Sequence, residues 1–146
     1  MTIEISKINH NHQKLEHQLN VFGKEVAKMY DYKVKSIKRV IDGDTVELEI
    51  DLGFHLTLCD KVRLAGVDTP ETRTTDPEEK ERGLKSKEWM KDRLSNIEGK
   101  ELVVKFVKEE KYGRLLGWLY FVGEPNTLNE QLINEGLAIP YMTDQL

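Results

Sequence analysis

The chain has 146 residues, of which 38% are hydrophobic, and its formal net charge is −4. This composition allows one folded domain and excludes a disordered chain. The negative charge argues against broad affinity for nucleic acid but is compatible with a local basic cleft. The single cysteine excludes an internal disulfide. Because no apolar run is typical of a secretory signal or a membrane span, we expect a cytoplasmic protein without membrane contact.

Residues 1–31 form the first of two predicted regions, an N-terminal helical extension. Within residues 11–30, apolar residues recur at alternating intervals of four and three, which predicts an amphipathic helix. This stripe either packs on the protein's own core or forms a seam with a second copy or another protein. Because three heptads are marginal for an independent coiled coil, packing or self-association is favoured over a specific partner. The stripe consists of Leu15, Leu19, Phe22, Val26 and Met29.

Three strands are predicted between residues 32 and 66. The first covers residues 32–41, and a phase slip near Ser36 indicates a bulge. In the second, apolar and acidic residues alternate from Val46 to Ile50, which is typical of a strand with one buried face. We expect a hairpin turn at Leu52-Gly53 and then a third alternating strand. The apolar positions of the third strand are Phe54, Leu56, Leu58, Val62 and Leu64.

The rest of the chain predicts a helix, two strands and a short helix. Asp76 and Pro77 are a typical helix cap and first residue, and Gly99 is the expected helix end. Thr127 and Glu130 form a capping box that begins the last helix. The buried side of the first helix is expected at Leu84, Trp89, Met90, Leu94 and Ile97. The two strands cover Glu101–Val107 and Leu115–Val122, the last helix runs to Glu135, and the tail from Leu137 has no predicted structure.

Five short strands with a helix after the third predict an α+β fold, a five-stranded OB-type β-barrel with helices. This domain is expected to cover residues 32–146.

Two aspartates at strand ends are the first candidates for chemistry. Asp44 follows a tight turn at Gly43, and Asp68 follows the strand that ends at Val67. Paired carboxylates held on strands suit Ca²⁺ or Mg²⁺, with water and a phosphate completing the shell. The four histidines are scattered and do not suit zinc. Taken singly, each aspartate is equally typical of an ordinary turn.

Glu71 and two arginines could supply the rest of a phosphodiester-cleaving site. Glu71 lies three residues after Asp68 and could polarise an attacking water, although a solvent-exposed acid has the same spacing. Arg63 alternates with buried neighbours on the third strand, and Arg114 begins the last strand. Guanidinium groups can bind the oxygens of a pentacoordinate phosphorus with parallel donors. The competing interpretation of each arginine is an ordinary surface residue.

Four motifs together resemble the staphylococcal nuclease-like (thermonuclease) family. The resemblance covers about residues 32–141 and leaves the N-terminal helix unexplained. The motifs are Val40–Val46 (VIDGDTV), Arg63–Glu71 (RLAGVDTPE), Glu109–Arg114 (EEKYGR) and Asn129–Ala138 (NEQLINEGLA).

The resemblance implies a role for each matching residue. Asp44 and Asp68 would be calcium carboxylates, with the Thr69 carbonyl as a further ligand, and Mg²⁺ or Mn²⁺ could also serve. Glu71 would be the general base. The implied phosphate clamp is Arg63 and Arg114, and the implied substrate-binding residues are Lys111, Tyr112 and Tyr141, the last being one residue out of step with the family's tyrosine.

The implied activity is hydrolysis of single- or double-stranded DNA, or RNA, with low sequence preference and 3′-phosphate products. The alternative is a catalytically weak module of the same fold that binds nucleic acid or protein. Such copies typically lack the acids or arginines, whereas this chain retains them, which favours the enzyme. In a third interpretation, the N-terminal helix is an adaptor for a partner.

Overall fold

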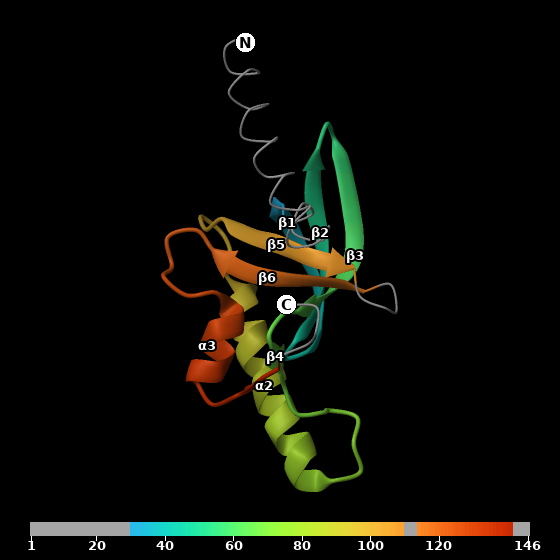
Figure 1. Cartoon of the computed structure of the whole chain (residues 1–146), viewed down its shortest axis with the longest axis vertical. Helices are drawn as coiled ribbons and strands as arrows, with labels where there is room; N and C mark the ends of the chain where they lie inside the picture. The colour runs from blue at the N-terminus through green and yellow to red at the C-terminus, as the bar shows by residue number, and fades with distance from the viewer. Residues whose placement is uncertain (1–29, 110–113, 142–146) are drawn as a thin grey trace, which may run out of the picture.

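The computed structural model describes residues 30–109 and 114–141. Five strands close into a barrel in the order β1-β2-β3-β6-β5, and a two-stranded sheet joins β4 to β7 (Figure 1). The predicted α+β fold with a five-stranded barrel is confirmed, and the β4–β7 pair is an addition to it. The strands are β1 (Asp31–Asp42), β2 (Thr45–Gly53), β3 (Leu56–Leu64), β4 (Val67–Asp68), β5 (Leu102–Glu109), β6 (Leu115–Phe121) and β7 (Ile139–Pro140), and the helices are α2 (Pro77–Ser95) and α3 (Leu128–Asn134).

The barrel core comes from the alternating strands. Val46, Leu48 and Ile50 of β2 are fully buried, as predicted. Strands β2 and β3 pair antiparallel, whereas β3 and β6 pair parallel and close the barrel. The β1–β2 register shifts between Val34 and Ser36, which confirms the bulge near Ser36. Figure 1 shows α2 and α3 together on one side of the barrel, away from the tip of the β2–β3 hairpin.

The β2–β3 turn lies two residues beyond the predicted position. Gly53 pairs with Leu56, so the turn consists of Phe54 and His55, both with positive φ (54° and 65°). A two-residue hairpin turn of this kind needs left-handed backbone at both central positions, which usually favours Asn-Gly. Phe54 is 93% exposed at the tip, so its predicted place on the buried face of a strand is wrong.

Helix α2 begins as predicted but ends earlier. Asp76 caps it by accepting from the Glu78 backbone N–H, whereas the helix ends at Ser95 rather than at Gly99. Gly99 lies in a later turn with φ 74°. Leu84, predicted to be buried, is 44% exposed. The buried line of the helix instead runs through Gly83, Ser86, Met90 and Leu94.

Gly83 explains the altered buried face of α2. A Cβ at this position would lie 2.7 Å from the carbonyl oxygens of Pro70 and Glu71. The helix therefore packs directly on the backbone that follows β4, and it does so through a residue without a side chain. A hydrophobic pattern does not mark such a contact.

The last helix and the tail complete the described structure. The capping box of Thr127 and Glu130 is confirmed at the start of α3. The tail forms β7, which pairs with β4, and the Tyr141 N–H donates to the Gly66 carbonyl at 2.9 Å. No helix within the described ranges is long and apolar enough to cross a membrane. The predicted N-terminal helix, with its proposed seam, lies outside the described residues.

Candidate active site

Arg63 lies between the two predicted metal-binding aspartates. Its Nη1 atom is 3.2 Å from Asp44 Oδ2, and its Nη2 atom is 3.5 Å from Asp68 Oδ1. Nη1 also donates to the Leu64 carbonyl at 3.1 Å. The β2–β3 register produces this arrangement, because it pairs Thr45 with Arg63 and so places Asp44 beside the arginine. Three residues predicted from two separate motifs thus form one cluster.

Asp44 is fixed by its surroundings. It is only 7% exposed, and its Oδ2 accepts from the Thr69 backbone N–H at 3.0 Å while Oδ1 accepts from the Thr45 hydroxyl at 3.0 Å. Its own carbonyl accepts from the Leu64 N–H at 2.8 Å. The preceding Gly43 leaves no room for a side chain, because a Cβ there would lie 2.7 Å from Ser86 Cβ. The carboxylate orientation is therefore set before any ligand binds.

Several acidic side chains lie close to one another around this cluster. Burial raises the pKa of Asp68, with Asp44 and Glu79 adding to the rise and Arg63 opposing it. Loss of solvent around the Glu71 carboxyl also raises its pKa, and the charges of neighbouring acids raise it further. The acids that raise the pKa of Glu71 are Asp42, Asp44, Asp68 and Glu79. A bound cation would relieve this repulsion.

The donor chemistry fits a hard cation. In the ranges that the structure describes, no three His, Cys, Asp or Glu side chains group closely enough to hold a metal by themselves. Two carboxylates and a backbone carbonyl are nevertheless a suitable partial set for Ca²⁺ or Mg²⁺, which accept water and substrate oxygens as further ligands. Asp44, Asp68 and the Thr69 carbonyl are the residues that would provide it.

The remaining predicted site residues are Arg114, Tyr141, Lys111 and Tyr112. Arg114 directly precedes β6, and Arg63 lies on β3, the strand that pairs with β6, where its partner is Leu116. Tyr141 is 48% exposed and follows β7, the partner of the strand that carries Asp68. Lys111 and Tyr112 fall outside the described residues, and their role stays a prediction.

A pocket of about 620 Å³ opens beside Asp68 and Glu71. Its other walls are α2 and the segment 136–139. Sequence motifs did not single out Arg82 and Lys85, which also line it. The helical spacing of Glu79, Arg82 and Lys85 could have indicated a shared face, but only the packing at Gly83 shows which face meets the acids.

Comparisons with known proteins identify the family of this chain. The family profile for staphylococcal nuclease homologues matches residues 61–145. A thermonuclease of Staphylococcus intermedius is 36% identical over 104 residues, which cover 70% of this chain and 56% of the relative. An uncharacterized protein of Methanocaldococcus jannaschii is 30% identical over 137 residues (79% and 62%), and the endonuclease YhcR of Bacillus subtilis is 35% identical over 113 residues (72% and 9%).

The chain spans less than two thirds of the length of these relatives. The profile match nevertheless covers more than half of the chain, including Arg63, Asp68, Glu71 and Arg114. The chain therefore belongs to the staphylococcal nuclease homologue family.

Proposed function

We propose that this protein is a calcium-dependent nuclease that hydrolyses phosphodiester bonds of DNA, RNA or both and leaves 3′-phosphate ends. The observation that carries the proposal is the cluster of Arg63 with Asp44 and Asp68 beside Glu71. Relatives that bear the names thermonuclease and endonuclease support a hydrolase acting on nucleic acid. The calcium requirement and the product ends rest on the family resemblance and on the oxygen donor set.

Each residue has a distinct task in the proposed reaction. Asp44, Asp68 and the Thr69 carbonyl would hold Ca²⁺, which supplies positive charge at the phosphate when bound. Glu71 accepts a proton from water as the water oxygen bonds to phosphorus. The P–O5′ bond then breaks, the 5′ oxygen takes a proton from solvent water, and the phosphate stays on the 3′ oxygen. Glu71 afterwards releases its proton to solvent.

The basic residues bind charge that grows during this step. Arg63 and Arg114 donate hydrogen bonds to the equatorial phosphate oxygens, and guanidinium groups remain charged at any relevant pH. Arg63 would exchange part of its contact with the two aspartates for the phosphate. Lys111, Tyr112 and Tyr141 are proposed to contact the substrate beside the scissile linkage.

The raised pKa of Glu71 suits a general base, because a more basic carboxylate accepts a proton more readily. The same acids that raise its pKa would be neutralised in part by a bound cation. The loop position of Glu71 also leaves its carboxylate accessible to water.

The direct test incubates the full chain with a labelled single-stranded DNA or RNA oligonucleotide in calcium, magnesium or chelator. We expect cleavage in calcium, loss of cleavage in chelator, and products that phosphatase treatment shifts in mobility because they end in 3′-phosphate. Binding without metal-dependent cleavage at high protein concentration would instead favour the module that only binds nucleic acid.

A further inference from the structure

The pocket beside the candidate active site continues past the acids along α2. Asp68 and Glu71 line one end, while Arg82 and Lys85 contribute the positive charge of the helical wall. Asp44 and Arg63 do not line the pocket. The pocket therefore adjoins the candidate active site and extends beyond it. Its volume of about 620 Å³ lies within the usual range for small-molecule sites.

The two cations are held close to the acids by the packing of α2. Gly83, the neighbour of Arg82, contacts the Pro70 and Glu71 carbonyls. Ser86, the neighbour of Lys85, donates to the Leu137 carbonyl at 2.6 Å, which fixes the opposite wall. The cationic side of α2 therefore has a fixed position relative to Glu71.

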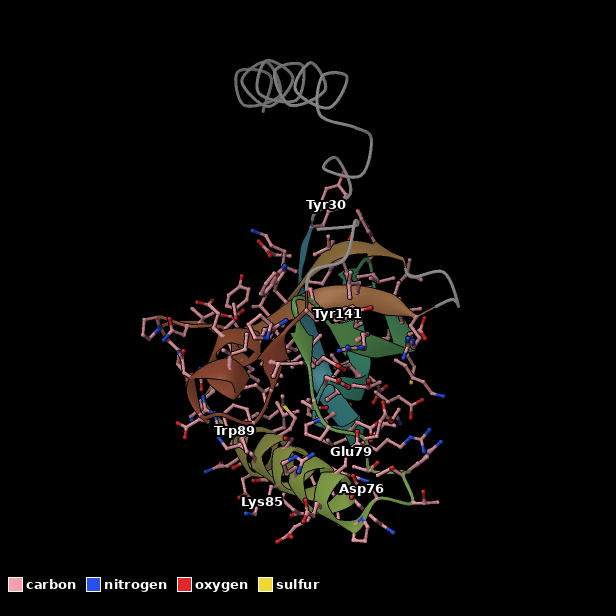
Figure 2. All side chains as sticks on the ribbon, turned by 60° about the horizontal axis from the view of Figure 1, so that its bottom comes forward. Tyr30, Asp76, Glu79, Lys85, Trp89 and Tyr141 are labelled. Carbon is pink, nitrogen blue, oxygen red and sulfur yellow. The ribbon has the colours of Figure 1, made fainter. Side chains whose placement is uncertain are left out.

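Arg82 and Lys85 are available to a ligand. Both are exposed, and neither forms an ion pair with any residue in the described ranges. They lie three residues apart on the helix, where Cβ atoms are about 5–6 Å apart. Figure 2 shows Glu79 and Lys85 in succession along α2. Successive phosphates of one strand could contact this pair.

The opposite wall of the pocket has a different chemistry. Leu137, Ala138 and Ile139 provide apolar surface, and Ile139 is 64% exposed. A nucleotide has the complementary division, with an anionic phosphate on one side and a base with apolar faces on the other. The arrangement of cations on one wall and apolar side chains on the other favours a nucleotide over a free inorganic anion.

We propose that this pocket binds the strand on one side of the scissile linkage, with Arg82 and Lys85 on flanking phosphates and Leu137–Ile139 against a base. The inference rests on the proposed nuclease function, because a strand whose scissile phosphate lies at Arg63 and Glu71 must leave the site in some direction. The acids Asp68, Glu71 and Glu79 in the same pocket confine phosphate binding to the part beside the two cations.

The test compares wild type with Arg82→Ala, Lys85→Ala and the double variant. Lys91→Ala is the matched control, because Lys91 lies on α2 outside the pocket and pairs with Glu88. Fluorescence anisotropy measures binding of labelled dinucleotides and octanucleotides in calcium at several salt concentrations, on a timescale shorter than cleavage or with non-hydrolysable linkages. Thermal unfolding verifies that each variant is folded.

We expect the double variant to bind the octanucleotide about tenfold more weakly and to bind the dinucleotide as wild type does. The slope of log affinity against log salt should fall by about 1.4, the value for two phosphate contacts to a single strand. In cleavage assays, KM for the octanucleotide should rise with little change in kcat.

Two results would overturn the proposed subsite. One is an octanucleotide affinity and salt slope equal to those of Lys91→Ala, and the other is an equal loss for both substrate lengths. If wild type fails to cleave but its binding still depends on Arg82 and Lys85, the subsite stands and the nuclease function fails. If wild type cleaves and the variants match the control, only the subsite fails.

Discussion

Asp44 and Glu71 belong to the same candidate site but are held in different ways. Asp44 lies on the barrel, where backbone and hydroxyl donors fix both carboxylate oxygens. Glu71 lies on an exposed loop, and its backbone is positioned by close packing against Gly83. The comparison indicates that Asp44, a proposed cation ligand, is fixed by hydrogen bonds, whereas the placement of Glu71, the proposed general base, depends on how α2 packs.

Arg63→Ala should give the largest effect. It removes a proposed hydrogen-bond donor to the phosphate. It also removes the guanidinium group that lies between the carboxylates of Asp44 and Asp68. We expect kcat to fall by about 10²-fold or more, because each transition-state donor of this kind contributes on that scale. Steady-state kinetics with an oligonucleotide measure the change. Near-normal turnover in both Arg63→Ala and Arg114→Ala would contradict the proposed clamp.

Glu71→Gln should separate the base from the metal ligands. We expect kcat to fall by about 10²-fold or more with calcium affinity retained, because the amide cannot accept the proton. Asp44→Asn should instead weaken calcium binding. Calorimetric titration of calcium into both variants distinguishes the two roles. A loss of calcium binding in Glu71→Gln would make Glu71 a metal ligand.

Gly83→Ala tests whether packing of α2 places Glu71. The added Cβ would meet the Pro70 and Glu71 carbonyls, so the loop or the helix must move. We expect kcat to fall about tenfold, with a stability loss of about 1–3 kcal/mol from overpacking. Kinetics below the unfolding transition measure the first effect, and denaturant unfolding measures the second.

Leu84→Ala is the control for that variant, because Leu84 lies on the same helix and is partly exposed. It should leave kcat close to wild type. If Gly83→Ala also retained full activity while folded, the loop would not depend on this contact.

The smallest effect is expected far from the acids, where Arg93 of α2 pairs with Glu124 at 2.5 Å. The hydrogen bond from Arg93 lowers the pKa of Glu124 below its usual 4.5. A lowered folded-state pKa stabilises the protein above the unfolded value, and this stabilisation is lost as pH falls through the folded value.

Glu124→Gln should therefore cost about 1 kcal/mol near pH 7 and progressively less as pH falls below about 4.5. Urea unfolding of both proteins across this pH range provides the measurement. Activity should not change at neutral pH, in contrast to the Gly83 variant. A stability difference that grows on acidification would contradict the assignment of this pair.

The features that could be predicted from the sequence are those that depend on a local residue pattern. Alternation identified the buried residues of β2, and capping residues marked the starts of α2 and α3. The site residues could be proposed because Asp44 and the segment Arg63–Glu71 carry the family's motifs. Their convergence required the β2–β3 register, which follows from the buried faces of the two strands.

The features that were missed depend on contacts between distant segments. Strand β7 exists through its pairing with β4, and two residues give no periodicity. Leu84 fits the helical pattern of apolar residues. Because α2 packs through Gly83 on the backbone of Pro70 and Glu71, however, Leu84 is left partly exposed. Arg82 and Lys85 look like ordinary surface residues until this packing places them beside Glu71.

The most direct measurement is a crystal structure of the protein with calcium and a nucleoside 3′,5′-bisphosphate. The account predicts one cation bound by Asp44, Asp68 and the Thr69 carbonyl, with Arg63 and Arg114 on one phosphate and Glu71 facing a water beside it. A cation bound elsewhere, or a nucleotide that leaves both Arg63 ion pairs intact and contacts neither arginine, would contradict it.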